Sequence, residues 1–290
     1  MATRKPGRLA TARGLACVLA TGLVFAGNAP SALAAEDVPF VSTPDPVTRA
    51  MLQLARVKPH DYLIDLGSGD GRIVILAAQR FGARGLGVEI VPDLVQQSIE
   101  NAQRAGVARR VEFREQDLFK TDLSAATVVT MYLLPDVNLQ LRPSLLALKP
   151  GTRIVSHDWD MGDWPPDRTL SVDVPEKTVG REKLSRVHLW VVPARVDGLW
   201  CSVGKAHTIS LRVAQTYQQF KAEAQAPGLV RAFEGRISGA RLATDWRGAE
   251  ELQLAVIGRQ LRVTRARAAF APLAARVFER AAGEACARIR

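Results

Sequence analysis

The sequence predicts an α/β fold, in which a doubly wound and mainly parallel sheet is followed by a β-rich C-terminal region. The first observation is residues 61–90, where an apolar run stops at a cluster of glycines and is followed by an apolar helical stretch and a second apolar run. Strand, glycine turn, helix and strand in this order are typical of a nucleotide-type pocket at the carboxyl end of a parallel sheet. The second is the alternation of apolar and polar residues from about residue 204, which indicates antiparallel strands.

Length and composition fit a globular protein with one large or two modest domains. The chain has 290 residues, of which 47% are hydrophobic and 23% charged, and its formal net charge is +10. A basic surface attracts acidic partners or a membrane. Because no compact basic run with interleaved aromatic residues occurs, we expect no nucleic-acid partner and interpret most of the charge as a solvated surface.

Residues 1–34 are predicted to be a signal peptide. Basic residues up to Arg13 precede an apolar stretch, Leu15 to Ala26, that is short for a membrane span. The small residues Ala32 and Ala34 fit the positions that signal peptidase recognises, so we expect cleavage after Ala34 and export to the periplasm. The exported protein could associate with the cell envelope. An uncleaved anchor in the inner membrane is the alternative.

The sheet domain is expected over residues 35–203, and it begins with a helix capped by Thr43 or Asp45. The first strand, Tyr62 to Leu66, then runs into a turn with glycines at alternate positions. Glycine takes positive φ angles and lets backbone N–H groups approach a ligand. The acid at the end of the second strand, Glu89, can accept two hydrogen bonds from a ribose diol. The candidate cofactor-binding residues of the turn are Asp65, Gly67, Ser68, Gly69, Asp70 and Gly71.

The spacing of the turn argues against a dinucleotide. Counted from Gly67, the G-x-G-x-x-G/A fingerprint needs a small residue at position 72, where the chain has Arg72. Asp65 and Asp70 add negative charge where a pyrophosphate needs a positive environment, whereas they would attract a sulfonium and an ammonium. A dinucleotide oxidoreductase is therefore the disfavoured functional alternative. The structural alternative is a glycine turn of an α/β protein that binds no ligand.

Two further strands lead to candidate residues. A helix from Pro92 to Ala105 precedes a third strand, 110–114, that leads to Asp117. A fourth strand, 127–132, ends at Tyr132 and Leu133. The helical spacing over Val137 to Leu148 contains Pro143, which predicts a kink or a late start of that helix.

The fifth strand, 152–156, is followed by a cluster of one histidine, two tryptophans and three acids. His157 and Asp158 are candidates to orient an amine or to take its proton. Trp159 or Trp164 could wall the amine by cation–π contact. A tight loop with tryptophan packed on the core is the structural alternative.

The end of the chain is predicted to be β-rich without chemistry of its own. The apolar runs 187–192 and 198–203 are expected to form a hairpin that completes a seven-strand sheet. Residues 204–290 are expected to form a small antiparallel sheet or barrel that ends in a helix from Ala268 to Arg290, with no metal site. Cys201 and Cys286 could pair in an oxidising compartment, or both could be buried free thiols.

The run Asp65-Leu-Gly-Ser-Gly-Asp-Gly resembles motif I of the class I, seven-strand S-adenosylmethionine-dependent methyltransferases, which have a Rossmann-like sheet. Glu89 resembles their ribose-binding acid, and Asp117 stands where they hold the adenine amino group. Over residues 39–165 the chain looks most similar to bacterial relatives of the lysine methyltransferase that modifies the c-ring of ATP synthase.

The resemblance implies S-adenosyl-L-methionine as cofactor and N-methylation of a protein lysine or a similar small amine. It implies that Tyr132, His157 and Asp158 act on the acceptor, that Leu133 lines the pocket, and that residues 39–43 close over the cofactor. The Asn-Pro-Pro-Tyr type motif is absent, which argues against an amide or base nitrogen as acceptor.

Export conflicts with a cofactor that is made in the cytosol. The alternative function is therefore an exported, non-catalytic module that keeps the fold and acts through its C-terminal domain.

Overall fold

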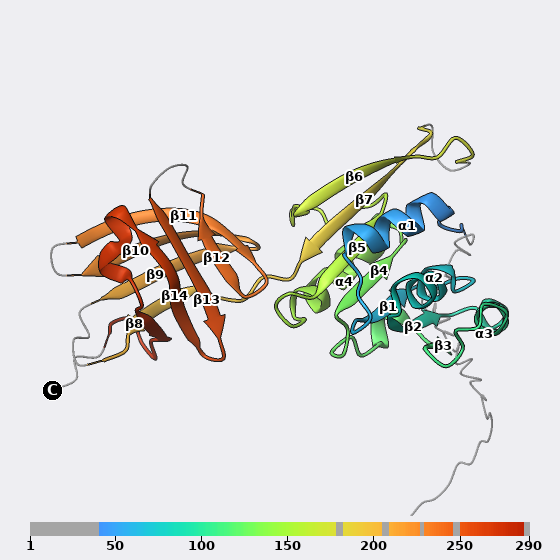
Figure 1. Ribbon diagram of the computed structural model, residues 1–290, viewed down its shortest axis with the longest axis horizontal. Coiled ribbons are helices and arrows are strands. Elements are labelled where there is room, and N and C mark those ends of the chain that lie inside the picture. Colours follow the sequence, from blue (N-terminus) through green and yellow to red (C-terminus); the bar gives the residue numbers. More distant parts are fainter. Residues whose placement is uncertain (1–40, 178–181, 205–208, 227–228, 246–249, 287–290) are drawn as a thin grey trace, which may run out of the picture. The chain divides into compact units, whose positions relative to one another are not determined.

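The computed structural model describes residues 41–177, 182–204, 209–226, 229–245 and 250–286, so the predicted signal peptide lies outside the described residues. A seven-strand sheet forms the first half of the described chain (Figure 1). Its strands are β1 (Tyr62–Leu66), β2 (Arg84–Glu89), β3 (Val111–Glu115), β4 (Val128–Met131), β5 (Arg153–His157), β6 (Arg168–Asp173) and β7 (Leu184–Val191). Their order is β3-β2-β1-β4-β5-β7-β6, and β7 alone runs opposite to the other six strands.

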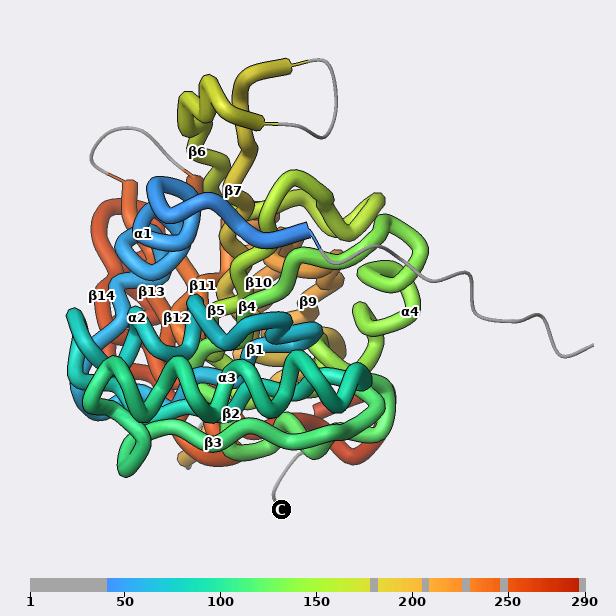
Figure 2. Tube along the Cα trace, turned by 90° about the vertical axis from the view of Figure 1, so that its right-hand side faces the viewer, coloured from blue at the N-terminus to red at the C-terminus, as the bar shows by residue number. Residues whose placement is uncertain are grey.

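Helices cover both faces of this sheet, as the doubly wound prediction requires. They are α1 (Asp45–Leu54), α2 (Arg72–Phe81), α3 (Pro92–Arg104) and α4 (Pro135–Leu146). Side chains alternate along β1, so Leu63 packs with α1, α2 and α3, whereas Ile64 points into the cluster of α4. Helices α2 and α3 lie side by side (Figure 2). The parallel strands therefore deliver their carboxyl ends to one edge of the sheet.

The predicted late start of the helix after β4 is wrong. Helix α4 begins at Pro135 and contains Pro143. Buried Leu141 and Leu145 flank this proline and pack against the sheet, so tertiary burial offsets the cost of the proline. The expected cap of α1 is wrong as well, since Pro44 occupies the cap position without a side-chain hydrogen bond. Among the residues that the structure describes, no helix combines the length and apolar character needed to cross a membrane.

The C-terminal half is a closed antiparallel barrel, drawn in orange and red in Figure 1. Its strands are β8 (Gly198–Ser202), β9 (Ser210–Thr216), β10 (Gln219–Ala226), β11 (Leu229–Ser238), β12 (Arg241–Thr244), β13 (Glu251–Ile257), β14 (Gln260–Arg267) and β15 (Val277–Arg280). Closure leaves no strand edge exposed. Trp200, Phe220, Phe233 and Phe278 are buried in its core. The alternating pattern thus correctly predicted the strands and the barrel alternative.

Two predicted elements at the end of the chain are wrong. The run 198–203 does not complete the sheet, because β8 pairs with β9 and β15 of the barrel, and the hairpin of the sheet is β6–β7. Over its described part, residues 268–286, the expected helix from Ala268 to Arg290 is instead a 3-10 helix, η2 (Ala268–Leu273), followed by β15. Closing the barrel requires a last strand between β14 and β8, and this pairing overrides the helix preference of an Ala/Arg-rich segment.

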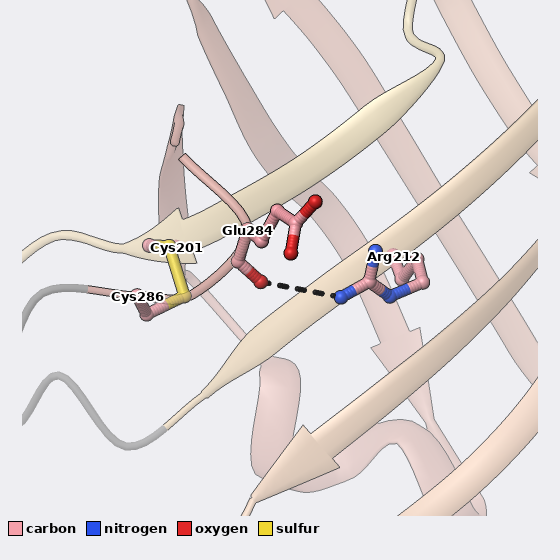
Figure 3. Close-up of a disulfide and its surroundings, with 4 residues drawn as sticks. All are labelled: Cys201, Arg212, Glu284 and Cys286. Atoms are coloured by element: carbon pink, nitrogen blue, oxygen red, sulfur yellow. Dashed lines mark hydrogen bonds between the residues drawn. A yellow bond between two sulfur atoms is a disulfide. The ribbon is translucent and has the colours of Figure 1, made fainter. Parts of the chain in front are cut away.

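Cys201 and Cys286 form a disulfide, which decides between the two alternatives left open by the sequence. The bond joins β8 to the segment after β15, and its Cα atoms are 5.6 Å apart. In Figure 3 the Arg212 guanidinium donates to the Glu284 carbonyl, two residues before Cys286. The described end of the chain is therefore fastened to the barrel.

Candidate active site

The glycine turn between β1 and α2 has the backbone that only glycine adopts easily. Gly67, Gly69 and Gly71 have φ angles of 69°, 54° and 79°. A Cβ atom on Gly67 would lie 2.9 Å from Leu133 Cδ2. The amides of Gly67 and Ser68 donate to Val88 O, so the turn is fastened to β2. Leu133, two residues beyond β4, therefore lies against the turn at Gly67.

Glu89 is oriented by backbone amides. One of its carboxylate oxygens accepts from Gly69 N at 3.0 Å, and the other accepts from Ile90 N at 2.8 Å and Val91 N at 3.1 Å. A carboxylate has about four lone-pair sites, so three amides leave room for a further donor. The acid at the end of β2 is therefore preorganised beside the glycine turn.

Asp65 is a fully buried carboxyl at the end of β1. Thr130 Oγ1 donates to it at 2.7 Å. Burial, against the lowering effect of the Thr130 hydrogen bond and together with the charges of Glu89 and Asp70, raises the pKa of Asp65 to about 8. At neutral pH this group carries a proton, and a nearby cation would favour its ionised form.

Asp70 is neutralised by Arg72, which corrects the charge argument made from the sequence. The Arg72 guanidinium donates to both Asp70 oxygens, at 2.9 Å from Nε and 2.6 Å from Nη2. Its Nη1 donates to Thr43 O at 2.9 Å. Arg72 therefore fastens the segment before α1 to the glycine turn. The negative charge left for a cation is that of Glu89, joined by Asp65 when a nearby cation ionises it.

Asp117 caps the short 3-10 helix η1 (Leu118–Lys120), since its side chain accepts from Phe119 N at 2.9 Å. Two large apolar side chains next to these acids were not singled out from the sequence. Ile90 follows Glu89 and is 65% exposed, and Phe119 follows Asp117 and is 50% exposed. The signal that could have found them is a large apolar residue directly after an acid at a strand end.

His157 is the buried centre of the side-chain cluster at the end of β5. Its ring lies against that of Tyr132, with centroids 3.9 Å apart. Its Nε2 is 2.9 Å from Ser185 Oγ, and its Nδ1 is 3.3 Å from Thr43 Oγ1. Burial lowers the pKa of His157 to about 4, against the opposing effect of Asp158. The imidazole is therefore neutral at pH 7 and makes contact with both β7 and the segment before α1.

Asp158 has a left-handed backbone with φ of 61°, which is uncommon outside glycine. One carboxylate oxygen accepts from Arg186 N at 2.9 Å. The other accepts from the Lys177 ammonium at 2.7 Å and lies 3.5 Å from His157 Nε2. Burial raises the pKa of Tyr132, and the Asp158 charge adds to this shift. The structure thus brings Tyr132, His157 and Asp158 together, and adds Lys177 and Ser185.

The two tryptophans of this cluster lie apart. Trp164 is fully buried, its indole donates to Gln218 Oε1 at 3.0 Å and its ring stacks with Tyr217. Trp164 thus packs on the core, as the structural alternative for this loop predicted, and it forms no wall for an amine. Trp159 is partly exposed. Among the described residues, no group of His, Cys, Asp and Glu side chains could hold a metal ion.

Comparison with known proteins points to one enzyme family. The family model described as the ANTKMT methyltransferase domain matches residues 65–168. A protein-lysine N-methyltransferase of Saccharolobus islandicus (strain REY15A) is 44% identical over 138 residues, which are 47% of this chain and 86% of the relative. The lysine N-methyltransferase of the adenine nucleotide translocase from Mus musculus is 38% identical over 147 residues. That match spans 47% of this chain and 63% of the mouse protein.

A solved structure also matches the chain. It is described as an RNA methyltransferase from Salinibacter ruber in complex with S-adenosyl-L-homocysteine. The two are 55% identical, the match covers 54% of this chain and 96% of the other, and the TM-score is 0.49.

Proposed function

We propose that this chain, which belongs to the class I S-adenosylmethionine-dependent methyltransferases, transfers a methyl group to the side-chain amine of a protein lysine. The observation that carries the choice of acceptor is the Asp158 carboxylate, which holds a lysine ammonium at the end of β5. The name of the Saccharolobus islandicus relative supports a protein lysine. Since the relatives are named as enzymes, the non-catalytic alternative is not favoured.

The residues at the glycine turn fit S-adenosyl-L-methionine. Its sulfonium and ammonium are cations, and Asp65 is a buried carboxyl that a cation would ionise. Glu89 keeps acceptor capacity for the ribose hydroxyls. We assign Ile90 and Phe119 to the two faces of the adenine, because both are exposed beside the acids Glu89 and Asp117. When bound, the cofactor supplies a methyl group on a positively charged sulfur.

The protein's part in the reaction is to bind and align the acceptor. A lysine ammonium has no lone pair and a pKa of about 10.4 in water, so it must lose a proton before it can react. Asp158 would orient the amine, and the Tyr132 and His157 rings would keep water away from it. Alignment of the nitrogen with the methyl carbon supplies most of the rate of such a displacement.

Labelling of blocked and unblocked extracts tests the acceptor. The full chain is incubated with methyl-labelled S-adenosylmethionine and a cell-envelope protein extract, and in parallel with the same extract after acetylation of its lysines. We expect label on the extract proteins only where their lysines are free, and a strong loss of that label with Asp158→Asn. Label that persists on the acetylated extract, or that enters RNA instead, would exclude a protein lysine as the acceptor.

We further infer that the chain is exported and that its substrate is a cell-envelope protein. The support is the Cys201–Cys286 disulfide, a bond typical of oxidising compartments, together with the apolar stretch at residues 15–26. The barrel would then serve as a surface for a partner or substrate. Fractionation and N-terminal sequencing test this proposal. A periplasmic protein that begins at residue 35 supports it, a membrane-bound protein that begins at Met1 supports the anchor, and a cytosolic protein refutes both.

A further inference from the structure

The amine held by Asp158 belongs to the chain itself. Lys177 lies in the connection between β6 and β7, and its side chain is 12% exposed. Its ammonium donates to Asp158 Oδ2 at 2.7 Å and to Leu184 O at 2.8 Å. Lysine is seldom this buried without a specific partner, because desolvation of the ammonium is costly. The site thus binds a lysine side chain by its nitrogen.

The carboxylate that receives this amine is oriented by the backbone rather than by Lys177. Asp158 N donates to Arg186 O at 2.7 Å, and Arg186 N donates back to Asp158 Oδ1 at 2.9 Å. These two bonds continue the β5–β7 pairing past His157 and fix the left-handed backbone of Asp158. Oδ2 is therefore directed to the amine position whether or not Lys177 fills it.

The amine position and the glycine turn lie on either side of the end of β4. β4 lies between β1 and β5, with Leu66 and Ser156 both in register with Met131. The two residues after Met131 then face opposite neighbours. Tyr132 lies against His157, and Leu133 closes on Gly67. Neighbouring strands are about 4.8 Å apart, so the ends of β1 and β5 are separated by about 10 Å.

A second connection runs through the segment before α1. Thr43 O accepts from Arg72, the first residue after the glycine turn, and Thr43 Oγ1 is 3.3 Å from His157 Nδ1. His157 in turn borders Asp158. The side chain of Lys177 therefore ends at a carboxylate that follows β5, the strand next to β4.

We propose that the chain methylates its own Lys177, whose amine fills the amine position before a lysine of another protein does. This inference rests on the proposed function. The proton of the third Nζ–H group, which neither Asp158 nor Leu184 accepts, passes to solvent, and the freed Nζ lone pair attacks the methyl carbon. The N–C bond forms as the C–S bond breaks, and its electron pair stays on sulfur, which yields neutral S-adenosylhomocysteine and protonated N-methyl-lysine.

The hydrogen bonds of Lys177 set the product. Two of the three N–H groups of the ammonium are used, by Asp158 and Leu184, which leaves one nitrogen valence for a methyl group. A monomethyl ammonium keeps both bonds, whereas a trimethyl ammonium keeps neither. The geometry therefore specifies monomethyl-lysine at position 177.

Peptide mass mapping of the full chain tests the proposal. The chain is made by cell-free synthesis in a mixture depleted of S-adenosylmethionine, purified, and then incubated with S-adenosylmethionine and no other protein. We expect one added methyl group, about 14 mass units, on the peptide that holds Lys177. The rate constant should not change when the protein is diluted tenfold, because the acceptor lies in its own site. Lys177→Arg should abolish the modification, and Lys183→Arg, in the same connection, should not.

A second measurement needs no cofactor. Acetic anhydride labels accessible, deprotonated amines, so Lys177 should react at least tenfold more slowly than Lys183. Asp158→Asn should remove most of that protection. Equal reactivity of the two lysines would mean that the amine is not held in the site, and the proposal would fall.

The outcomes also separate this inference from the proposed function. Methyl groups on an envelope protein but none on Lys177, or on other lysines alone, overturn the inference and leave the function standing. Methyl transfer to neither acceptor, with Lys177 still protected from acetylation, removes the function together with the inference.

Discussion

Replacement of Asp65 by asparagine probes the buried carboxyl at the end of β1. An unfolded aspartate has a pKa of about 3.9, whereas burial raises the pKa of Asp65 in the fold to about 8. Between these two values the unfolded chain has lost the proton and the folded chain keeps it. Stability is therefore fully present below about pH 4 and is lost as the pH rises toward 8.

The size of this loss follows from the two pKa values. Each pH unit between them costs about 1.4 kcal/mol, so the folded state loses about 4 kcal/mol from pH 5 to pH 8. The asparagine of the variant would not ionise, and its carbonyl oxygen can accept from Thr130 as the carboxyl does. Its extra amide donor costs about 1–3 kcal/mol if it finds no partner, but this cost does not depend on pH.

Denaturant unfolding of the full chain and of Asp65→Asn at several pH values measures the effect. We expect the free energy of unfolding of the variant, minus that of the native chain, to increase by about 4 kcal/mol from pH 5 to pH 8. Other titrating groups cancel in this difference. A difference that stays constant within about 1 kcal/mol over this range would refute a protonated Asp65.

His157 changes the folding stability with pH in the opposite direction to Asp65. The effect of Asp65 is therefore isolated only by comparing Asp65→Asn with the native chain. Burial lowers its pKa from about 6.5 to about 4, so the unfolded chain binds a proton that the folded chain refuses. Its contribution to stability is present above pH 6.5 and is lost as the pH falls toward 4. In the native chain the two groups oppose each other between pH 4 and 6.5.

Three further predictions concern the cofactor and the barrel. Binding of S-adenosylmethionine at pH 7 should release close to one proton, seen as a dependence of the calorimetric enthalpy on the buffer, and Asp65→Asn should abolish this release. Gly67→Ala should weaken cofactor binding more than tenfold in a titration, whereas Gly106→Ala, with a similar φ of 71° and no neighbour within 4 Å, should leave it unchanged. Reduction of the disulfide, which spans 85 residues, should lower the stability of the barrel by about 2–5 kcal/mol, and the double variant Cys201→Ser, Cys286→Ser should not respond to reductant.

The sequence was a good guide where the signal is local. Short segments of the sequence indicate the glycine turn and the acids at the ends of β1 and β2 and just after β3. The seven-strand sheet was expected from the resemblance, and the structure confirms it. The period-two pattern likewise predicted barrel strands, since alternation requires only that one face is buried. These features depend on neighbours in the chain.

The misplaced elements depend on partners that are distant in the chain. The run at β8 is as apolar as a strand of the sheet, and its pairing with β9 and with the distant β15 assigns it to the barrel. The contact between Thr43 and His157 joins residues 114 positions apart. Arg72 was interpreted as evidence against a dinucleotide, but its pairing with Asp70 could be seen only once the turn was folded.

The disulfide makes the barrel a closed loop of covalent bonds. Cys201 stands in the first barrel strand and Cys286 just beyond the last, and those two strands are neighbours around the barrel. A protease that cuts one peptide bond between these cysteines would leave two pieces that still migrate as one chain on a non-reducing gel. In a compartment that contains proteases, a nicked barrel would keep all of its strands attached to the sheet domain.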